Sequence, residues 1–552
     1  MKIEYVDGTL LKKCFIGAAN DLERNKAEVN ALNVFPVPDG DTGTNMSLTM
    51  QSAVKQILDI NELNAHKVAN AASNGSLMGA RGNSGVILSQ LFRGFANGLE
   101  NHEQVNTKIL ANTFKLAANT AYKAVMKPTE GTILTVAREI GDKALVLSEE
   151  EEDIVIFLKE IVEYGNSVLA KTPEMLPVLK QAGVVDAGGK GLMVVLTGAY
   201  LALTTDDDVD FEGISERKIV DMHSAEIIDP EDIKFGYCTE FIINNTDADP
   251  EQFKEQLSLY GDSIISVGNG DLIKVHVHTN NPGEVLEKAL LLGELNDIKI
   301  DNMRYQHRNL VFDKEKSKES TDTENVNENE HVENKEYGFI TVAIGDGIAN
   351  VFKDLGVDYV IPGGQTMNPS TEDILKAVDK VQANNIIILP NNGNIVLAAE
   401  QAKELSEKNL HILKTKTIPE GVVALLSFNS DLSAEDNMDS MRESVENVKT
   451  GEVTYAVRDT EIGDVKVKKD DILGISQGEI KAINDGIQKV SLELLKKLVD
   501  EDDSLITIFY GEDIKEEEAE ELSSLLEDEF DDCDVELLYG GQPLYYFIFS
   551  VE

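Results

Sequence analysis

Apolar residues recur at three- and four-residue spacing through roughly the first 200 residues of the chain, for example in Leu10–Leu32, Thr44–Ile60 and Asn106–Met126. This spacing is typical of amphipathic helices, and the alternation that marks strands is absent. About eight such segments can be counted, separated by short turns that contain Gly, Pro or Asn. The pattern predicts an all-α domain over residues 1–204, folded as a compact helical bundle or barrel.

The periodicity changes after this helical region. Phe235–Ile243 and Leu272–Thr279 have the composition and alternation of strands, and Asp249–Leu259 between them has helical spacing. A mixture of strands and helices over about 100 residues predicts a middle α/β domain at residues 205–312.

A polar segment follows at residues 313–336. It is rich in Glu, Asn, Ser, Thr and Lys and has almost no apolar side chains, so we expect a disordered acidic linker. Strands and helices then alternate from Gly338 onward, which indicates a parallel sheet in a C-terminal α/β domain over residues 337–552. We expect an acidic helix at Glu512–Glu529 and a last strand near Leu544–Val551.

Composition limits the class of protein. A net charge of −49 argues against nucleic acid as a partner, because phosphate backbones require Lys and Arg. No apolar run approaches the roughly 20 residues of a membrane span, so we expect no integral membrane segment. Cys14, Cys238 and Cys533 lie far apart without disulfide spacing, which favours a reduced, cytoplasmic protein. We interpret Cys14 and Cys533 as structural.

Asp39 and Asp41 lie two residues apart in a Pro- and Gly-rich turn, directly before the helical pattern that begins near Thr44. Two close carboxylates need a cation between them to stay ionised, and carboxylate oxygen is a ligand that Mg²⁺ prefers. A helix start beside them would stabilise an anion. The pair predicts a site for Mg²⁺ and a nucleoside triphosphate, although a lone Asp-Gly-Asp would more simply be a solvated surface turn.

A second motif, Met78–Val86, contains three closely spaced glycines. Asn83 and Ser84 are expected to cap a helix that begins at Val86. A glycine-rich turn at a helix start can bind phosphate. A helix–helix connection that needs small residues is an equally good explanation of this motif alone.

Two further loops repeat this design, at Thr129–Ile133 and Gly183–Gly191. The second superficially suggests a Walker A loop, but its spacing is off by one residue and Gly191 stands where Ser or Thr is required. Four polar, glycine-rich loops at helix starts in one domain nevertheless indicate one shared binding site.

The middle domain carries a separate group of reactive side chains. His276 and His278 are two residues apart on one predicted strand, and Cys238 and Glu240 are two apart on another. Residues at this spacing share a face of a strand. Cys238 with both His would suit Zn²⁺, with Glu240, water or substrate in the fourth position. Alternatively a His acts as an acid or base, or contacts phosphate, beside a reactive Cys. A buried Cys with two solvent-facing His would have no function.

Together, the Asp-Gly-Asp-Thr-Gly-Thr-Asn-Met, Gly-Asn-Ser-Gly, Glu-Gly-Thr and Val-Asp-Ala-Gly-Gly motifs resemble the ATP-binding L-subunit domain of dihydroxyacetone kinases. That family implies an eight-helix barrel that holds ATP with two Mg²⁺ ions at one end. The longer stretch Leu32–Asp39 resembles the catalytic subunit of bacterial fatty acid kinase. Its three-domain layout, with a C-terminal domain of DegV type, also fits, as does Tyr539–Tyr545.

The resemblance assigns roles to residues of the helical domain. Asp39 and Asp41 match two aspartates that bind magnesium in that family. Val34 stands where dihydroxyacetone kinases have a third such aspartate, and the adjacent Asn33 could contribute a carbonyl oxygen in its place. Asp186 matches the loop that closes the nucleotide pocket. The other residues assigned to nucleotide binding are Thr44, Asn45, Gly82, Asn83, Ser84, Thr132 and Gly183.

The C-terminal domain has polar loops at predicted strand ends, Gly363–Pro369 and Pro390–Asn394. Such loops form the binding crevice of an open α/β sheet, which in DegV-type proteins holds a lipid. Gln365, Thr366 and Asn391 are candidates for binding lipid or for docking a separate lipid carrier, or they are ordinary loop residues.

The resemblance implies an ATP-dependent phosphotransferase. Its acceptor would be the carboxylate of a fatty acid presented by a separate fatty-acid-binding protein, and its product an acyl phosphate for phospholipid synthesis. Two alternatives stay open: a kinase for dihydroxyacetone or another small molecule, and a non-catalytic nucleotide-sensing regulatory protein. Related kinases are often dimers, so a homodimer is expected.

Overall fold

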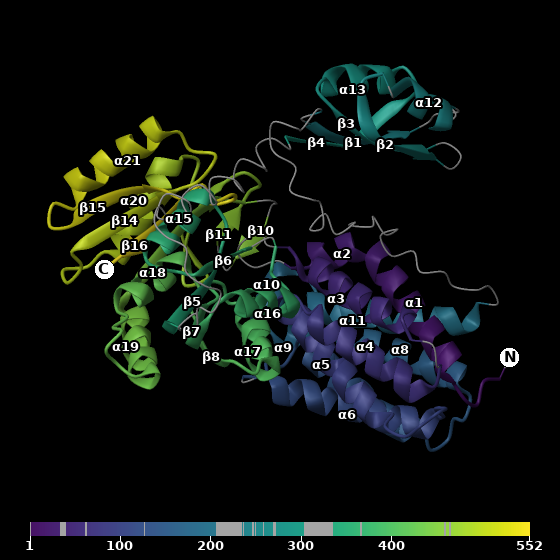
Figure 1. The fold of residues 1–552 in the computed structure, drawn as a ribbon. Coiled ribbons are helices and arrows are strands. Elements are labelled where there is room, and N and C mark those ends of the chain that lie inside the picture. The colour runs from purple at the N-terminus through teal and green to yellow at the C-terminus, as the bar shows by residue number, and fades with distance from the viewer. Residues whose placement is uncertain are drawn as a thin grey trace, which may run out of the picture. The chain divides into compact units, whose positions relative to one another are not determined.

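The computed structural model describes residues 2–33, 40–60, 63–125, 127–205, 235, 237–244, 248, 250–257, 259–268, 272–302, 335–364, 367–456, 460–462 and 465–552. It divides into two compact units (Figure 1). Residues 1–215 and 333–552 form the first unit, in which the helical and C-terminal domains pack together. Residues 216–332 form the second unit, which is the middle domain.

Residues 2–205, where described, are helical and contain no strand. The eight helices of 14 residues or more in this part are α1 Gly8–Arg24, α3 Thr42–Leu58, α4 Ala65–Met78, α5 Gly82–Gly98, α6 Thr107–Ala124, α7 Ile133–Leu147, α8 Ile154–Leu169 and α11 Ala187–Thr204. Three short helices are α2 Lys26–Ala31, α9 Thr172–Met175 and α10 Pro177–Ala182. The all-α prediction for this domain is confirmed.

Side-chain caps and close helix contacts explain how this domain packs. Asp7 caps α1 by accepting a hydrogen bond from the Leu10 backbone N–H, and four other long helices are also capped by Asp or Asn. Helices α1 and α11 approach closely at Gly17 and Gly198, because a Cβ on Gly198 would lie 2.7 Å from the Gly17 carbonyl oxygen. Helix α11 also packs against α8, so the last long helix of the domain contacts both the first long helix, α1, and the long helix before it, α8.

Helix α11 is long and apolar enough to cross a membrane, judged by length and composition alone. It is the one such helix within the described residues, and 56% of its 18 residues are buried inside the protein. Its burial between α1 and α8 identifies it as a core helix of this domain.

The middle domain is a four-stranded antiparallel sheet in the order β2-β3-β1-β4. Its elements are β1 Tyr237–Asn244, α12 Pro250–Leu257, β2 Gly261–Gly268, β3 Leu272–Thr279, α13 Pro282–Leu290 and β4 Glu294–Asn302. The predicted pair of strands with a helix between them corresponds to β1, α12 and β3. The sequence prediction missed β2, α13 and β4.

The C-terminal domain begins with a parallel sheet in the order β6-β5-β7-β8. These strands are β5 Lys335–Ala343, β6 Tyr359–Pro362, β7 Ala383–Leu389 and β8 Asn409–Ile412. The helices of this half are α15 Asp346–Asp354, α16 Thr371–Lys380, α17 Val396–Leu405, α18 Ile418–Leu426 and α19 Ala434–Asn447. The predicted parallel sheet is confirmed. The predicted linker lies outside the described residues except for its last two, which begin β5.

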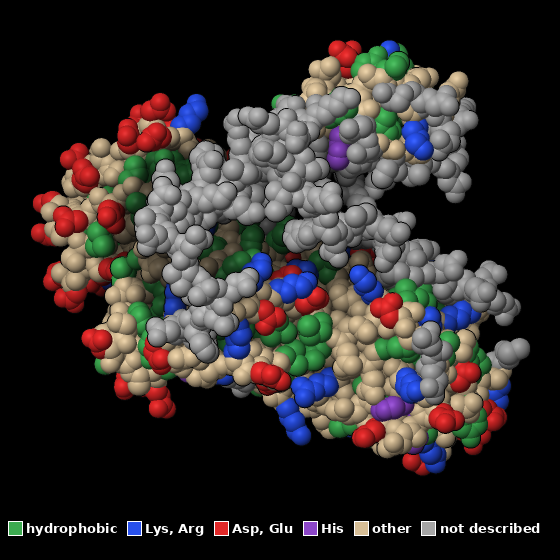
Figure 2. All heavy atoms as spheres, viewed as in Figure 1, with side chains coloured by type: hydrophobic (Ala, Val, Ile, Leu, Met, Phe, Trp, Pro, Cys, Tyr) green, Lys and Arg blue, Asp and Glu red, His purple; other side chains and the backbone are tan. Residues whose placement is uncertain are grey.

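A second, mixed sheet completes this domain and was not predicted. Its order is β13-β12-β9-β16-β14-β15. The remaining elements are β9 Lys449–Tyr455, β10 Thr460–Ile462, β11 Val465–Val467, β12 Ile472–Ser476, β13 Glu479–Asn484, α20 Ile487–Leu498, β14 Leu505–Tyr510, α21 Glu516–Glu529, β15 Asp534–Tyr539 and β16 Phe547–Val551. Figure 2 shows acidic side chains gathered on the face around α21, the predicted acidic helix.

The helical and C-terminal domains share a buried interface. Ala80 and Val86 of the helical domain belong to the same apolar cluster as the core of the parallel sheet. The Thr371 backbone N–H donates to the Ala80 carbonyl (3.2 Å), and Gln401 on α17 donates to the Leu77 carbonyl (2.8 Å). The glycine-rich turn between α4 and α5 is therefore inserted into the C-terminal domain.

Asn391 fixes the loop that follows β7. Its buried side-chain amide donates to the Thr341 hydroxyl (2.7 Å) and the Val342 carbonyl (3.1 Å), and accepts from the Thr415 hydroxyl (2.8 Å). Its φ of 53° lies in the left-handed region, which Asn tolerates better than most residues. The amide is thus used inside the domain.

We predict that Asn391→Ala lowers the unfolding free energy of the C-terminal domain by about 3 kcal/mol, because buried partners lose their hydrogen bonds. Hydrogen exchange of the β5 and β7 amides in denaturant measures this. Asn384→Ala, at an exposed position on β7, is the control and should change stability by less than about 0.5 kcal/mol. Equal effects of the two variants would show that the Asn391 network contributes nothing.

Candidate functional site

Four helix N-termini converge on one pocket in the first unit. Helices α3, α5, α7 and α11 all begin at it, and its empty volume is about 1210 Å³ with its open mouth included. The N-terminus of a helix presents free backbone N–H groups and a partial positive charge. The lining residues are Leu32, Asn33, Asp41, Thr42, Asn45, Asn83, Ser84, Ile87, Val125, Lys127, Thr129, Thr132, Ile133, Leu134, Val178, Leu179, Asp186, Ala187, Gly188 and Asn394.

Asp41 is the buried carboxylate of this pocket. Its side chain is 7% exposed, and burial raises its pKa to about 6, although hydrogen bonds from Asn45 and Asn368 act in the opposite direction. The bond from Asn368 Nδ2 to Asp41 Oδ2 is 2.5 Å long. Asn368 belongs to the C-terminal domain, so residues 327 positions apart meet at this carboxylate.

Gly82 allows the start of α5 to approach Asp41. Its φ is 57°, and a Cβ there would lie 2.4 Å from the Asn45 side-chain nitrogen and 3.4 Å from that of Asn368. The next residue, Asn83, donates to the Asn394 side-chain oxygen of the C-terminal domain (3.0 Å). Gly82 is therefore required for close approach, as the motif predicted.

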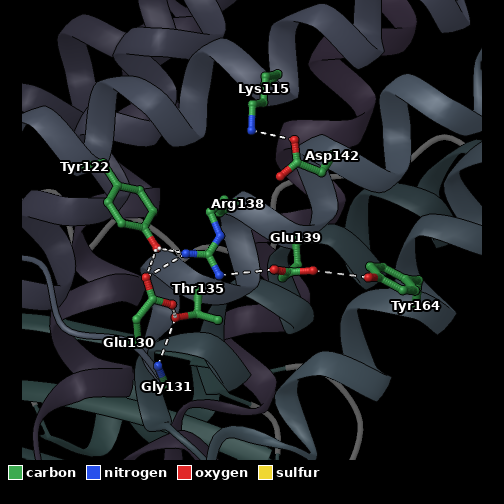
Figure 3. A network of polar contacts seen from close by, with 9 residues as sticks. All are labelled: Lys115, Tyr122, Glu130, Gly131, Thr135, Arg138, Glu139, Asp142 and Tyr164. Atoms are coloured by element: carbon green, nitrogen blue, oxygen red, sulfur yellow. Dashed lines mark hydrogen bonds and ion pairs between the residues drawn. The ribbon is translucent and has the colours of Figure 1, made fainter. Parts of the chain in front are cut away.

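A network of hydrogen bonds and ion pairs around Glu130 holds the loop at residues 129–132 in place (Figure 3). The Glu130 carboxylate accepts hydrogen bonds from Arg138 (2.6 Å), the Thr135 hydroxyl (2.7 Å) and Tyr122 (3.1 Å). Glu130 does not line the pocket. Its role in the Glu-Gly-Thr motif is thus to anchor the loop that carries Thr129 and Thr132 to the pocket.

Asp186 joins the starts of two helices. Its carboxylate accepts from the Gly189 backbone N–H of α11 (2.7 Å) and from the Ile133 backbone N–H of α7. Burial raises its pKa to about 6 against these hydrogen bonds. Asp186 therefore fixes the starts of α7 and α11 where they line the pocket.

Most of the residues assigned to nucleotide binding line this pocket, namely Asn33, Asp41, Asn45, Asn83, Ser84, Thr132 and Asp186. Thr44 does not line it, because its hydroxyl accepts from Asn30 on α2 and its backbone N–H donates to the same side chain. Gly183 also does not: it ends α10 at a φ of 66° and is exposed. Asp39 lies outside the described residues.

One local prediction was wrong. Helix α5 begins at Gly82 and its N-cap is Arg81, so Asn83 and Ser84 belong to its first turn and do not cap it. Without a capping bond to make, Asn83 is available to contact the C-terminal domain. The physical reason is that Gly82 itself takes the left-handed conformation that starts the helix.

Sequence reasoning missed Asn368, Asn394 and Lys127. The two asparagines belong to C-terminal loops whose meeting with the pocket depends on domain packing. Lys127 is exposed at the mouth and is the one Lys or Arg among the described lining residues. Asn391, a predicted binding residue, is engaged inside its own domain. Gln365 and Thr366 lie outside the described residues.

The middle-domain group is described only in part. The strand register pairs Cys238 with His278 and Glu240 with His276 across β1 and β3. The side chains of Cys238, Glu240 and His276 lie outside the described residues. Among the side chains that are described, no group of three His, Cys, Asp or Glu is placed to hold a metal ion, so zinc is not supported.

The pocket suits a magnesium nucleotide. Among the described residues, Asn83 Oδ1 and Asn368 Oδ1 are buried without a hydrogen-bond partner. The Asn368 amide contacts Asp41, and Asn83 lines the same pocket as Asp41. Unpartnered buried oxygens are costly unless a cation or its water ligands engage them. Carboxylate and amide oxygens form the donor set that Mg²⁺ prefers, and the four helix starts favour phosphate.

Three family models match the chain. The DAK2 domain matches residues 36–201, the middle domain of the FakA-like fatty acid kinase proteins matches residues 234–310, and their C-terminal domain matches residues 338–552. DAK2 is a kinase-family domain, which implies the use of ATP and Mg²⁺ in general.

Full-length relatives agree with these matches. Protein YloV of Bacillus subtilis is 44% identical over 563 residues, and an uncharacterized protein of Staphylococcus aureus strain USA300 is 41% identical over 557 residues; each comparison covers 100% of both chains. A DegV family protein of Corynebacterium glutamicum, with a solved structure, is 13% identical at a TM-score of 0.33, covering 39% of this chain and 97% of its own. From the three consecutive domain matches and these full-length relatives, the chain belongs to the family of FakA-like fatty acid kinase proteins.

Proposed function

We propose that this protein is the ATP-dependent catalytic component of a cytoplasmic fatty acid kinase. The observation that carries the proposal is the convergence of four helix starts on one pocket that the buried carboxylate of Asp41 lines. Family membership supplies the kinase chemistry, and the pocket supplies a place for the nucleotide. Asp39 would join Asp41 in holding Mg²⁺, with Asn33 and Asn45 as neighbouring amide donors.

Phosphoryl transfer requires little covalent chemistry from the protein, so these residues act by positioning and by neutralising charge. Mg²⁺ supplies charge neutralisation at the phosphates when it is bound. The backbone N–H groups at the starts of α5, α7 and α11 would hold the phosphate oxygens. Lys127 at the mouth would add a positive charge near the outermost phosphate.

The acceptor would be a fatty acid carboxylate. Its oxygen forms a bond to the γ-phosphorus while the bond from that phosphorus to the β–γ bridging oxygen breaks, giving an acyl phosphate and ADP. The apolar chain of a fatty acid is poorly soluble, so a separate fatty-acid-binding protein would present the carboxylate. Acyl phosphate would feed phospholipid synthesis. We further propose that the protein forms a homodimer.

The sensor interpretation draws on one observation. Asn368 links the nucleotide pocket directly to the C-terminal domain, which is how ATP binding would change the state of a regulatory domain. A sensor would bind ATP without sustained, acceptor-dependent release of ADP. Turnover therefore separates this interpretation from the kinase.

We predict that ADP release requires Mg-ATP, a long-chain fatty acid and its carrier protein together, and that hydroxylamine traps an acyl hydroxamate. Omitting each component in turn measures this. Release with dihydroxyacetone alone would instead identify a small-molecule kinase. Tight ATP binding with no turnover on any acceptor would favour the sensor.

We predict that Asp41→Asn stabilises the nucleotide-free protein at pH 7 while abolishing its stabilisation by Mg-ADP. In the wild type, the folded-state pKa of about 6 lies above the ordinary value of 3.8, so the folded state holds the proton more tightly. The contribution of Asp41 to the unfolding free energy therefore falls by on the order of 1–3 kcal/mol as pH rises from about 4 to 6. Above pH 6 it stays at this lower value.

Thermal melting at pH 5 and pH 7, with and without Mg-ADP, tests this prediction. The difference in stability between the two pH values should shrink in Asp41→Asn. Asp186 and Glu452, whose pKa values burial also raises, contribute to the part that remains. Mg-ADP should protect the wild type less at pH 5, where Asp41 is protonated. A variant that Mg-ADP still stabilises fully would exclude Asp41 as a magnesium ligand.

We also propose that Cys238, His276 and His278 take part in transfer, either through bound Zn²⁺ or directly. We predict that Cys238→Ala lowers turnover, since the strand register places Cys238 opposite His278. Elemental analysis separates the two routes: a loss of bound zinc supports the metal, and unchanged metal content with lost turnover supports direct action. Turnover equal to the wild type would remove the site from the mechanism.

A further inference from the structure

One turn serves both the nucleotide pocket and the domain interface. Arg81 donates to the Asn368 carbonyl (2.8 Å) and forms an ion pair with Asp373 (3.2 Å), both in the C-terminal domain. The next two residues, Gly82 and Asn83, form the start of α5 at the pocket. A shift of the C-terminal domain must therefore also move the start of α5 at the pocket, and the reverse. The reason is that three consecutive residues contact both the C-terminal domain and the pocket.

The C-terminal domain reaches the pocket through two side chains. Asn394 lines the pocket and accepts from Asn83, and Asn368 contacts the Asp41 carboxylate. Asn368 is 2% exposed, and its Oδ1 has no hydrogen-bond partner among the described residues. Asn83 Oδ1 is a second buried acceptor without a partner in the described part of the chain. One unpartnered oxygen therefore belongs to the amide that contacts the carboxylate expected to hold the metal, and the other belongs to a residue that lines the same pocket.

We infer that the docked C-terminal domain completes the magnesium–nucleotide site, with Asn368 as the residue that couples docking to nucleotide binding. The inference rests on the proposed function, since it requires a nucleotide in this pocket. The side-chain oxygen of Asn368 is an additional ligand for the metal, or a hydrogen-bond acceptor for its water ligands. Since linkage is reciprocal, Mg-nucleotide must strengthen docking by the same factor by which docking strengthens nucleotide binding.

The Asn368 side-chain amide could instead weaken metal binding. In that case its N–H group, which donates to Asp41 Oδ2, would compete with Mg²⁺ for the same oxygen. The two unpartnered oxygens favour completion of the site, because a purely competitive contact gives them no role. The two cases predict opposite effects of removing the amide.

The experiment measures Mg-ADP binding to the full chain by calorimetry, for the wild type and four variants. Asn368→Ala should weaken binding about tenfold, since it removes a hydrogen-bonding group beside a charge. Asn368→Asp keeps an oxygen and should bind close to the wild type at saturating Mg²⁺. Gln401→Ala loosens the interface outside the pocket and should weaken binding in the same direction.

Docking itself is read by hydrogen exchange of the Thr371 amide, which donates across the interface to Ala80. Mg-ADP should slow this exchange in the wild type and have little effect in Asn368→Ala. Asn437→Ala is the matched control, because Asn437 is a buried asparagine of the same domain that bonds only within the turn at residues 429–432. It should leave nucleotide affinity unchanged.

Four results would overturn the inference. Asn368→Ala binding as tightly as the wild type would remove the coupling, and tighter binding would show that the amide competes with the metal. Asn368→Asp binding as weakly as Asn368→Ala would leave a structural role only. A wild-type protein that does not bind Mg-ADP would overturn the proposed function and the inference with it.

Discussion

The contact between Asp41 and Asn368 links the candidate nucleotide pocket of the helical domain directly to the C-terminal domain. A carboxylate that is 7% exposed has lost most of its water, and this loss must be offset by hydrogen bonds or a cation. Asn45 on the same helix and Asn368 from the C-terminal domain supply the hydrogen bonds. The start of α5 can lie beside them because Gly82 has no side chain. One buried charge therefore fixes the positions of two helix starts and a separate domain.

The charge of the protein explains the chemistry of the pocket. A chain with a net charge of −49 repels nucleotides at long range, and the described lining of the pocket has a single Lys. In the proposed kinase, attraction for phosphate must then come from short-range sources. Helix N-termini would provide it without formal charge, and Mg²⁺ would provide it with the nucleotide. The glycine-rich loops mark these helix N-termini in the sequence.

Local patterns predicted the local structure well. Helical spacing identified the long helices, and alternating elements identified the parallel sheet, because these patterns reflect burial within a few turns of chain. The glycine-rich motifs correctly marked four helix starts at one pocket. The start of α5 was misplaced because Gly82, and not Asn83 or Ser84, begins the helix. Thr44 does not line the pocket, because its hydroxyl and backbone N–H bond to Asn30, a neighbour on a short helix.

Contacts between distant segments could not be predicted in this way. Asn368 and Asn394 lie in polar loops with no periodicity. The packing of the helical domain against the C-terminal domain, with Ala80 and Val86 in the C-terminal core, brings Asn368 to Asp41 and Asn394 to Asn83. The mixed sheet was missed for a related reason, since β9 and β16 pair across almost 100 residues. The domain interface is thus the part of the site that required the structure.

Crystals of the full chain grown with ADP and Mn²⁺ in place of Mg²⁺ test the central claim most directly, because Mn²⁺ is visible by its anomalous scattering. We predict an anomalous peak for Mn²⁺ within bonding distance of the Asp41 carboxylate. The nucleotide phosphates should lie at the starts of α5 and α11, and Asn368 should lie beside the metal. A metal and nucleotide bound away from Asp41, or bound there with Asn368 and the C-terminal domain withdrawn, would contradict this claim.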